Sequence, residues 1–285
     1  KKNMNIFVLH PHEKVSLVQR KLMSTVKEKN VFNIAIEGNF DDCQNLVKSM
    51  FADKEFSNSI NMSGVNSINW ARIIAQAVYY FYTYFQVQDK RSMNFSVPTG
   101  NFGDVYAGYL SKKMGLPINK FIVATNKNDI LHRAITNGNY EVESVSETNS
   151  PSMDIQIASN FERLIYDLND FNDVETGNVM KKIKEEGKYI IPKDKLQKIS
   201  NDFLSENMSE TEVLNIIKDV HNRYNVILDP HSAIGFGALK KINLEGNNIV
   251  LATAHPCKFP EAIDKSIGIK PSLPNELQYI MNEKE

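Results

Sequence analysis

The stretch Ser96-Val97-Pro98-Thr99-Gly100-Asn101-Phe102-Gly103-Asp104 has the pattern of a strand end, a tight loop and the first turn of a helix. The residues before Pro98 are partly apolar, as in a strand that stops at the loop. Gly100 and Gly103 allow positive φ and, lacking a Cβ, let the backbone approach a ligand closely. The helix that follows is expected to end at Gly115, placed as its C′ residue.

The beginning of that helix is a candidate anion site, because unpaired N–H groups and the positive end of the helix dipole face the loop. The spacing differs from the Walker phosphate loop, which needs Gly-Lys-Ser/Thr, and from the dinucleotide fingerprint Gly-x-Gly-x-x-Gly. On its own the pattern fits either an anion-binding loop or an ordinary turn.

Composition narrows the classes of function. The chain has 285 residues, 42% of them hydrophobic and 24% charged, with a net charge of −1. This suffices for a sizeable core, and the lack of a basic excess gives no reason to expect nucleic acid or a membrane as partner. Cys43 and Cys257 lack metal-ligand spacing and are expected to be buried or unreactive thiols. They indicate a reducing compartment, either the cytoplasm, which we expect, or an organelle matrix. Metal-binding His-x-x-x-His and Cys-x-x-Cys motifs and the hydrolase motif Gly-x-Ser-x-Gly do not occur, so no metal is expected.

The first part of the chain alternates strands and helices, which predicts parallel strands in an α/β arrangement. Strands are expected at 5–9 and 32–36, and Ser16 with Gln19 forms a capping box for a helix between them. A buried parallel strand needs neighbours, so the chain is expected to begin inside a domain. A loop over 56–65 then separates the rest of a small α/β domain, 1–62, from a large α/β domain, 63–285.

The large domain is expected to continue the same alternation. An aromatic helix at 70–85, with Trp70 in the core, precedes the opening stretch, and a strand at 121–125 ends in a polar loop. Ligands of open α/β sheets lie at such strand ends. Further on, we expect mostly helices over 161–222, a short strand at 226–228, a helix from Asp229-Pro230 and a last strand at 249–253.

Two more sites are candidates for ligand contacts. Ser67, Asn69 and Arg72 gather at the start of the aromatic helix, where hydroxyl, amide and guanidinium groups suit an anion. The same residues also fit an ordinary N-cap with a surface arginine. Thr253 follows the last strand and fits either a hydrogen bond to a cofactor ring nitrogen or the capping of a backbone carbonyl.

Taken together and in order, several segments resemble the threonine synthase family, in the branch found in fungi and many bacteria. These enzymes use pyridoxal 5′-phosphate and have the tryptophan synthase β-like fold, with open, mostly parallel sheets and flanking helices. The number and order of the segments are more specific than any one of them. The segments are 40–44, 66–72, 96–104, 124–126, 153–155, 159–164, 229–231 and 253–256.

The resemblance implies roles for the candidate residues. Gly100, Asn101, Phe102, Gly103 and Asp104 would form the cup for the cofactor phosphate, and Thr253 would bond the pyridine nitrogen. Ser67, Asn69 and Arg72 would hold the substrate phosphate. The family converts O-phosphohomoserine and water to threonine and phosphate, and a monomer or weak homo-oligomer is expected.

The family's Schiff-base lysine, in a Phe-Lys-Asp segment, and its Ser-Gly-Asp-Thr-Gly loop are both missing from this sequence. Both are expected upstream of Lys1, so none of the residues 1–285 is assigned the role of that lysine. The chain therefore resembles the C-terminal part of a threonine synthase, and by itself it is expected to show little or no turnover.

Two alternatives to this interpretation stay open. One is another enzyme of the same group, such as a threonine dehydratase or cysteine synthase. The other is a non-catalytic homologue that binds a phosphorylated ligand.

Overall fold

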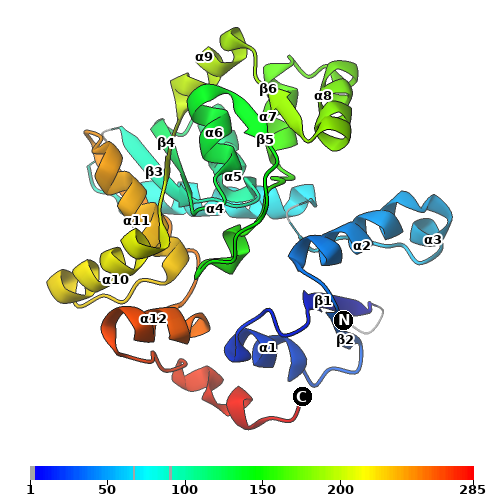
Figure 1. Ribbon diagram of the computed structural model, residues 1–285, viewed down its shortest axis with the longest axis vertical. Helices are drawn as coiled ribbons and strands as arrows, with labels where there is room; N and C mark the ends of the chain where they lie inside the picture. The colour runs from blue at the N-terminus through cyan, green and yellow to red at the C-terminus, as the bar shows by residue number, and fades with distance from the viewer. Residues whose placement is uncertain (1–3, 67, 90–91) are drawn as a thin grey trace. The chain divides into compact units, whose positions relative to one another are not determined.

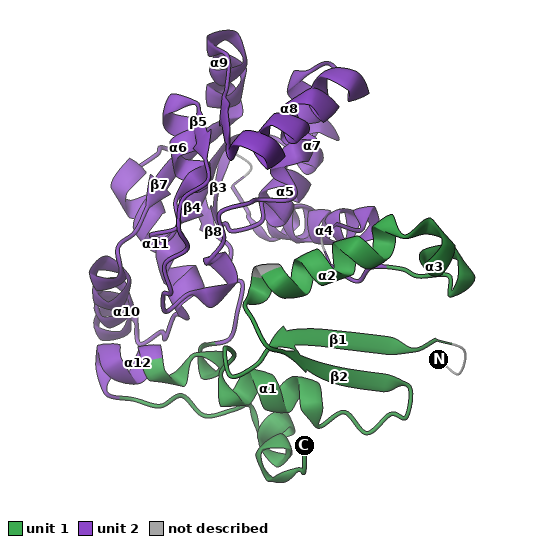
Figure 2. Ribbon diagram, turned by 45° about the vertical axis from the view of Figure 1, so that its right-hand side comes forward, with its two compact units in different colours: residues 1–63, 256–261, 269–285 green, residues 64–255, 262–268 purple. Residues whose placement is uncertain are grey.

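The structure, a computed structural model, describes residues 4–66, 68–89 and 92–285. The chain divides into two compact units, which are coloured separately in Figure 2. Unit 1 comprises 1–63, 256–261 and 269–285, and unit 2 comprises 64–255 and 262–268. The first segment of unit 1 ends next to the expected boundary at 62. Residues 256–261 and 269–285, however, cluster with unit 1 and not with the large unit.

Unit 2 is built on a four-stranded parallel sheet with the order β7-β4-β3-β8. The opening stretch of the sequence leaves the sheet at the end of β3, one of its two central strands. β3 is buried at every position, as expected for a strand with neighbours on both sides. The strands are β3 (Met93–Pro98), β4 (Ile118–Thr125), β7 (Phe203–Asn207) and β8 (Asn247–Val250).

Alternate side chains of these strands enter two different hydrophobic clusters, one on each face of the sheet. Phe95 and Phe121 belong to the cluster packed with α4 (Trp70–Gln86), α5 (Gly103–Lys113) and α7 (Phe161–Leu168). Ile122 and Ala124 belong to the cluster packed with α10 (Glu210–Tyr224) and α11 (Pro230–Ile242). The unit is therefore a three-layer α/β structure (Figure 1). It also contains α6 (Ile130–Asn137), β5 (Asn139–Glu141), η1 (Pro151–Met153), α8 (Asp173–Glu186), β6 (Lys188–Ile190), α9 (Lys193–Asp202) and most of α12 (Pro260–Ile267).

Unit 1 contains the expected strand–helix pairs. Its two strands pair in parallel over six residues, and the capping box of Ser16 with Gln19 is present at the start of α1. The C-terminal 3-10 helix η3 contacts α1 within this unit. Its elements are β1 (Ile6–Pro11), α1 (Leu17–Ser24), β2 (Val31–Ile36), α2 (Phe40–Ala52), α3 (Lys54–Ser59), η2 (Pro256–Lys258) and η3 (Asn275–Asn282).

Some expected elements are wrong. The expected loop over 56–65 begins inside α3, which Asp53 caps through a hydrogen bond from the Phe56 N–H. Residues 226–228 form no strand, because the chain leaves α10 through the left-handed residue Asn225 and runs directly to the α11 N-cap. The last strand ends at 250 rather than 253. Edge strand β7 was missed because its partly exposed, polar residues lack the apolar pattern of a central strand.

The aromatic helix is present, but only half of it is buried. Ile73, Ala77 and Tyr80 face the core of unit 2, whereas Trp70, predicted to be a core residue, is 45% exposed. The two cysteines are confirmed as buried, free thiols.

Candidate functional site

The loop between β3 and α5 is held by Phe102 rather than by glycine flexibility. Phe102 adopts the left-handed conformation, with φ of 64°, while neither Gly100 nor Gly103 uses the positive φ that glycine allows. The Phe102 side chain is 1% exposed and packs on the rings of Phe161 and Phe203, at centroid distances of 5.3 and 5.8 Å. Buried aromatic packing offsets the cost of a left-handed conformation at a bulky residue.

Gly100 is required for a different reason, the close approach of another backbone segment. A Cβ at this position would lie 2.8 Å from the carbonyl oxygen of Ser152 and 3.1 Å from the Cα of Met153. The loop is therefore packed against η1, and no larger residue fits at Gly100 without a shift of the backbone.

The N-terminus of α5 is available to an anion. No side chain of the described residues caps it, and the helical hydrogen bonds begin with the Tyr106 N–H donating to the Phe102 carbonyl at 3.0 Å. Helical N–H groups ahead of Tyr106 have no acceptor within the helix, so they point into the loop together with the positive end of the dipole. The expected α5 C-terminus is also present, since Gly115 follows the C-cap with φ of 105°.

Asn101 ties the loop to the turn that precedes α7. Its side-chain oxygen accepts a hydrogen bond from the Ser159 N–H at 2.5 Å, and its backbone carbonyl accepts one from the Asn160 N–H at 3.1 Å. The Asn101 carboxamide oxygen thus has a structural role in shaping the loop.

Arg163 of α7 connects this loop to the second predicted anion site. Its Nε donates to the Asn160 side-chain oxygen at 2.9 Å, and its Nη2 donates to the Ile68 carbonyl at 3.0 Å. The guanidinium also lies over the Trp70 ring, 5.3 Å from the centroid. The start of α4 and the β3–α5 loop therefore belong to one connected region. Sequence reasoning gave Arg163 no role, although its i, i+3 spacing from Asn160 indicated a local bond.

The two described residues that were predicted to bind the substrate phosphate differ in whether their side chains are already used in hydrogen bonds. Asn69 is the N-cap of α4: its side-chain oxygen accepts from the Ala71 N–H at 2.9 Å, and its amide group donates to the Gly64 carbonyl at 2.7 Å. Arg72 is exposed in the first turn of the same helix, and its guanidinium has no ion-pair partner among the described residues. Asn69 is thus occupied by capping, while Arg72 is available to an anion.

Two of the positions used in the sequence predictions lie outside the described residues. One is Ser67, the third predicted substrate-phosphate residue. The other is Lys1, upstream of which the Schiff-base lysine is expected. The predicted role of Ser67 and the expected place of that lysine therefore stay predictions.

Thr253 lies beyond β8, the strand next to β3, and its backbone is fixed by α11. The Asp229 carboxylate caps α11 through the His231 and Ser232 N–H groups at 2.9 and 3.3 Å, and it accepts a hydrogen bond from the Ser232 hydroxyl. The Ser232 hydroxyl oxygen in turn accepts from the Thr253 N–H at 3.3 Å. The Thr253 side chain is exposed at the carboxyl edge of the sheet.

Asp104, in the first turn of α5, is a perturbed acid. Burial raises its pKa to about 6, although the Tyr80 hydroxyl, 3.2 Å from its carboxylate, acts in the opposite direction. The helix N-terminus also favours the charged form, so the cost of burial is the larger effect here.

We expect the Asp104→Asn variant to lack the loss of folding stability that ionisation of Asp104 causes in the wild-type chain as pH rises. The folded pKa is above the ordinary value, so the wild-type chain loses stability as pH rises from about 4 to about 6. A shift of about two pKa units corresponds to at most about 3 kcal/mol. The free energy of urea unfolding of wild type minus that of Asp104→Asn should fall over this window and level off above it. A constant difference from pH 4 to pH 8 would contradict the assignment.

The polar loop after β4 has a structural role. Amide groups of Asn126 and Asn128 donate to one Asp154 carboxylate oxygen at 2.8 and 2.9 Å, and the Thr148 hydroxyl donates to the same oxygen at 2.6 Å. Burial raises the pKa of Asp154. This network fixes η1, the segment on which Gly100 packs.

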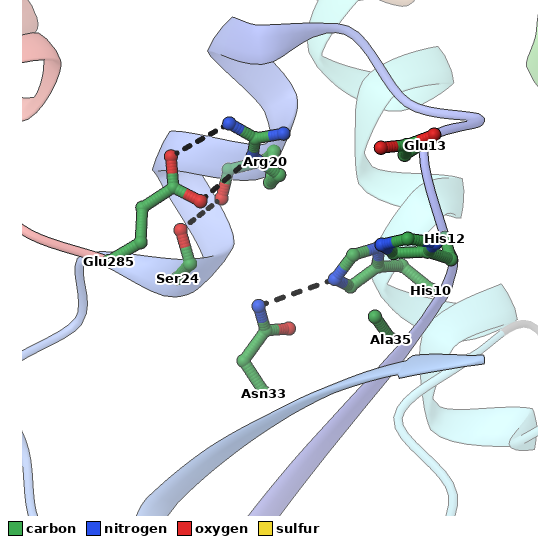
Figure 3. A pocket seen from close by; sticks show the side chains of 8 residues that line it. All are labelled: His10, His12, Glu13, Arg20, Ser24, Asn33, Ala35 and Glu285. Atoms are coloured by element: carbon green, nitrogen blue, oxygen red, sulfur yellow. Dashed lines mark hydrogen bonds and ion pairs between the residues drawn. The ribbon is translucent and has the colours of Figure 1, made fainter.

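A separate cavity of about 500 Å³ lies in unit 1 and contains none of the predicted site residues (Figure 3). Some of its polar groups bond one another: Arg20 pairs with Glu285 at 2.8 Å, and the ring Nε2 of His10 lies 3.3 Å from the Asn33 amide. Within the described parts of the chain, no cluster of metal-ligating side chains and no helix able to cross a membrane is found.

Comparisons with known proteins show which proteins the whole chain is similar to. The family model "Threonine synthase, C-terminal" matches residues 232–285. The threonine synthase of Pseudomonas aeruginosa is 45% identical over 99% of this chain and 61% of its own, and that of Saccharomyces cerevisiae is 41% identical over 100% and 61%. A crystal structure of PLP-bound threonine synthase from Brucella melitensis superposes with a TM-score of 0.91, at 46% identity over 99% of this chain and 61% of that one.

The parallel sheet, its flanking helices and the strand–loop–helix site place the chain in the tryptophan synthase β-like fold class of pyridoxal-phosphate enzymes. Within this class it is similar to the threonine synthases of bacteria and fungi, and the family model that it matches is that of their C-terminal part. The chain spans about three fifths of the length of the relatives it matches.

Proposed function

We propose that this chain supplies three sets of contacts in a threonine synthase. They are the contacts to the phosphate of the cofactor, to its pyridine nitrogen and to the phosphate of the substrate. The observation that carries the proposal is the uncapped N-terminus of α5 behind a loop that is anchored by the buried Phe102 ring and packed closely against η1 at Gly100. The reaction is the conversion of O-phosphohomoserine and water to threonine and phosphate, in a reducing compartment such as the cytoplasm.

A pyridoxal phosphate group fits the residues present. Its phosphate monoester suits the N–H groups at the start of α5, and Asp104, with its raised pKa, is largely neutral at mildly acidic pH and then repels the phosphate little. A neutral hydroxyl, that of Thr253, suits the pyridine nitrogen. Its backbone is positioned by Ser232, which the Asp229 carboxylate holds.

When bound, the cofactor supplies an electron sink for carbanion chemistry. The chain's own residues bind and orient the cofactor and the substrate. The β3–α5 loop fixes the phosphate end, Thr253 sets the hydrogen bond at the ring, and Arg72 binds the phosphate that leaves the substrate. Arg163 holds the start of α4 against Asn160, so the two anion sites keep a fixed separation. The lysine that bonds the cofactor covalently is expected in the part of the family's chain that precedes the position matched by Lys1.

The test is a chimera in which the N-terminal two fifths of the Pseudomonas aeruginosa relative precede residues 1–285. We expect it to release phosphate from O-phosphohomoserine, Thr253→Val to reduce this release, and the 285-residue chain alone to release little or none. Turnover of threonine or O-acetylserine without phosphate release would assign the chain to another enzyme of the group. A folded chimera with no turnover and no visible absorbance from lysine-bound cofactor would favour a non-catalytic homologue.

Replacement of Arg72 by alanine in that chimera should raise KM for O-phosphohomoserine by about 10–100-fold, because a charge-assisted phosphate contact is lost. Cofactor absorbance should be unchanged. Steady-state kinetics and a visible spectrum of the same sample measure the two effects. Loss of cofactor with an unchanged KM would show that Arg72 serves the cofactor phosphate instead.

A further inference from the structure

Helix α4 carries a stripe of exposed apolar side chains opposite its buried face. Six large apolar residues of this 17-residue helix are 45–70% exposed. Arg72 is the only charged residue in the helix. The stripe comprises Trp70, Ile74, Val78, Tyr79, Tyr82 and Phe85.

A helix at a water-exposed surface has a polar outer face, whereas a helix that is apolar all round is covered on both sides. Apart from the neighbours Val78 and Tyr79, successive members of the stripe are three or four residues apart, and the stripe extends for about 22 Å along the axis. Contiguous apolar surface of this kind marks an interface rather than a solvated face.

Unit 1, taken by itself, has a comparable feature. Its two described strands form a parallel sheet, and Phe7 and Phe32 are register partners whose rings stack at 4.9 Å while 59% and 43% exposed. Parallel sheets are normally covered on both faces. Both units therefore carry apolar surface of the kind that a longer polypeptide buries.

We propose that the α4 stripe is the docking surface for the polypeptide segment that precedes the matched region in threonine synthases. The relatives that match 99–100% of this chain are longer by about two fifths of their own length, and the C-terminal family model matches this chain at its C-terminal end. That length is enough to supply an apolar face for the stripe. The near absence of charge on α4 is typical of a permanent, core-like interface. The inference goes beyond the proposed function, since docking needs neither cofactor nor turnover.

Thiol labelling tests this docking surface. Val78→Cys places a thiol on the stripe, and Val174→Cys, on α8, is the matched control, since the two valines are 60% and 69% exposed. The native thiols, Cys43 and Cys257, are buried and give a slow background. Labelling rates are measured in the 285-residue chain and in the Pseudomonas aeruginosa chimera, with light scattering to establish that each sample is monomeric.

Both introduced thiols should react at similar rates in the 285-residue chain. In the chimera, Val78→Cys should react at least 100-fold more slowly, while Val174→Cys keeps its rate. Equal rates at Val78→Cys in both proteins would overturn the proposal. Protection in the 285-residue chain alone that grows with its concentration would also overturn it, and would assign the stripe to a second copy. The labelling rates do not depend on the enzyme assay. A failure of the docking proposal can therefore be distinguished from a failure of the proposed function.

Discussion

Replacement of Phe102 by alanine is expected to lower the free energy of unfolding of this chain by about 3–5 kcal/mol, the usual cost of truncating a buried phenylalanine. The ring is 1% exposed and packs on Phe161 and Phe203, so its removal leaves a cavity beneath the β3–α5 loop. Urea unfolding of the 285-residue chain measures the change. The loop should also lose its affinity for phosphate, because its left-handed residue no longer has an anchor.

Phe171 offers a matched control for this substitution. It also has positive φ, 62°, but it is 60% exposed. Phe171→Ala should therefore cost less than about 1 kcal/mol. If the two alanine variants had the same stability, burial of Phe102 would not be what holds the loop.

Gly100→Ala is expected to cost about 1–3 kcal/mol, since its Cβ would meet the backbone of Ser152 and Met153 at 2.8 and 3.1 Å. The loop or η1 must move, and either movement displaces the N–H groups that face the anion. Urea unfolding and a titration with inorganic phosphate would show a less stable chain with weaker binding.

Gly177→Ala is the control, with an effect of opposite sign. Gly177 lies within α8 and has nothing within 4 Å of an added Cβ, so alanine should stabilise the helix by about 0.5–1 kcal/mol. A stabilising Gly100→Ala would contradict the close packing of the loop on η1.

The sequence was informative wherever local chemistry decides the structure. Asp229 and Pro230 begin α11 as expected, because an N-cap carboxylate followed by proline is a local signal. The β3–α5 connection was also predicted, from a strand that ends at a glycine-bearing loop.

The features that could not be predicted from the sequence depend on contacts between distant parts of the chain. Positive φ at Phe102 depends on a pocket formed by residues 59 and 101 positions further along the chain. Arg163 connects Asn160 with the start of α4, a contact that spans 95 residues and leaves no local pattern. The exposed half of α4 was missed because apolar residues predict burial, and the sequence does not show which other segment would cover them.

The central claim is that the N–H groups at the start of α5 bind the phosphate of pyridoxal phosphate. Amide chemical shifts of the isotope-labelled 285-residue chain test it most directly, in titrations with pyridoxal phosphate, inorganic phosphate and pyridoxal. We expect Gly103, Asp104 and Val105 to shift with the first two and not with pyridoxal, which has no phosphate. Unchanged amides at these residues under saturating pyridoxal phosphate, or equal shifts with pyridoxal, would contradict the account.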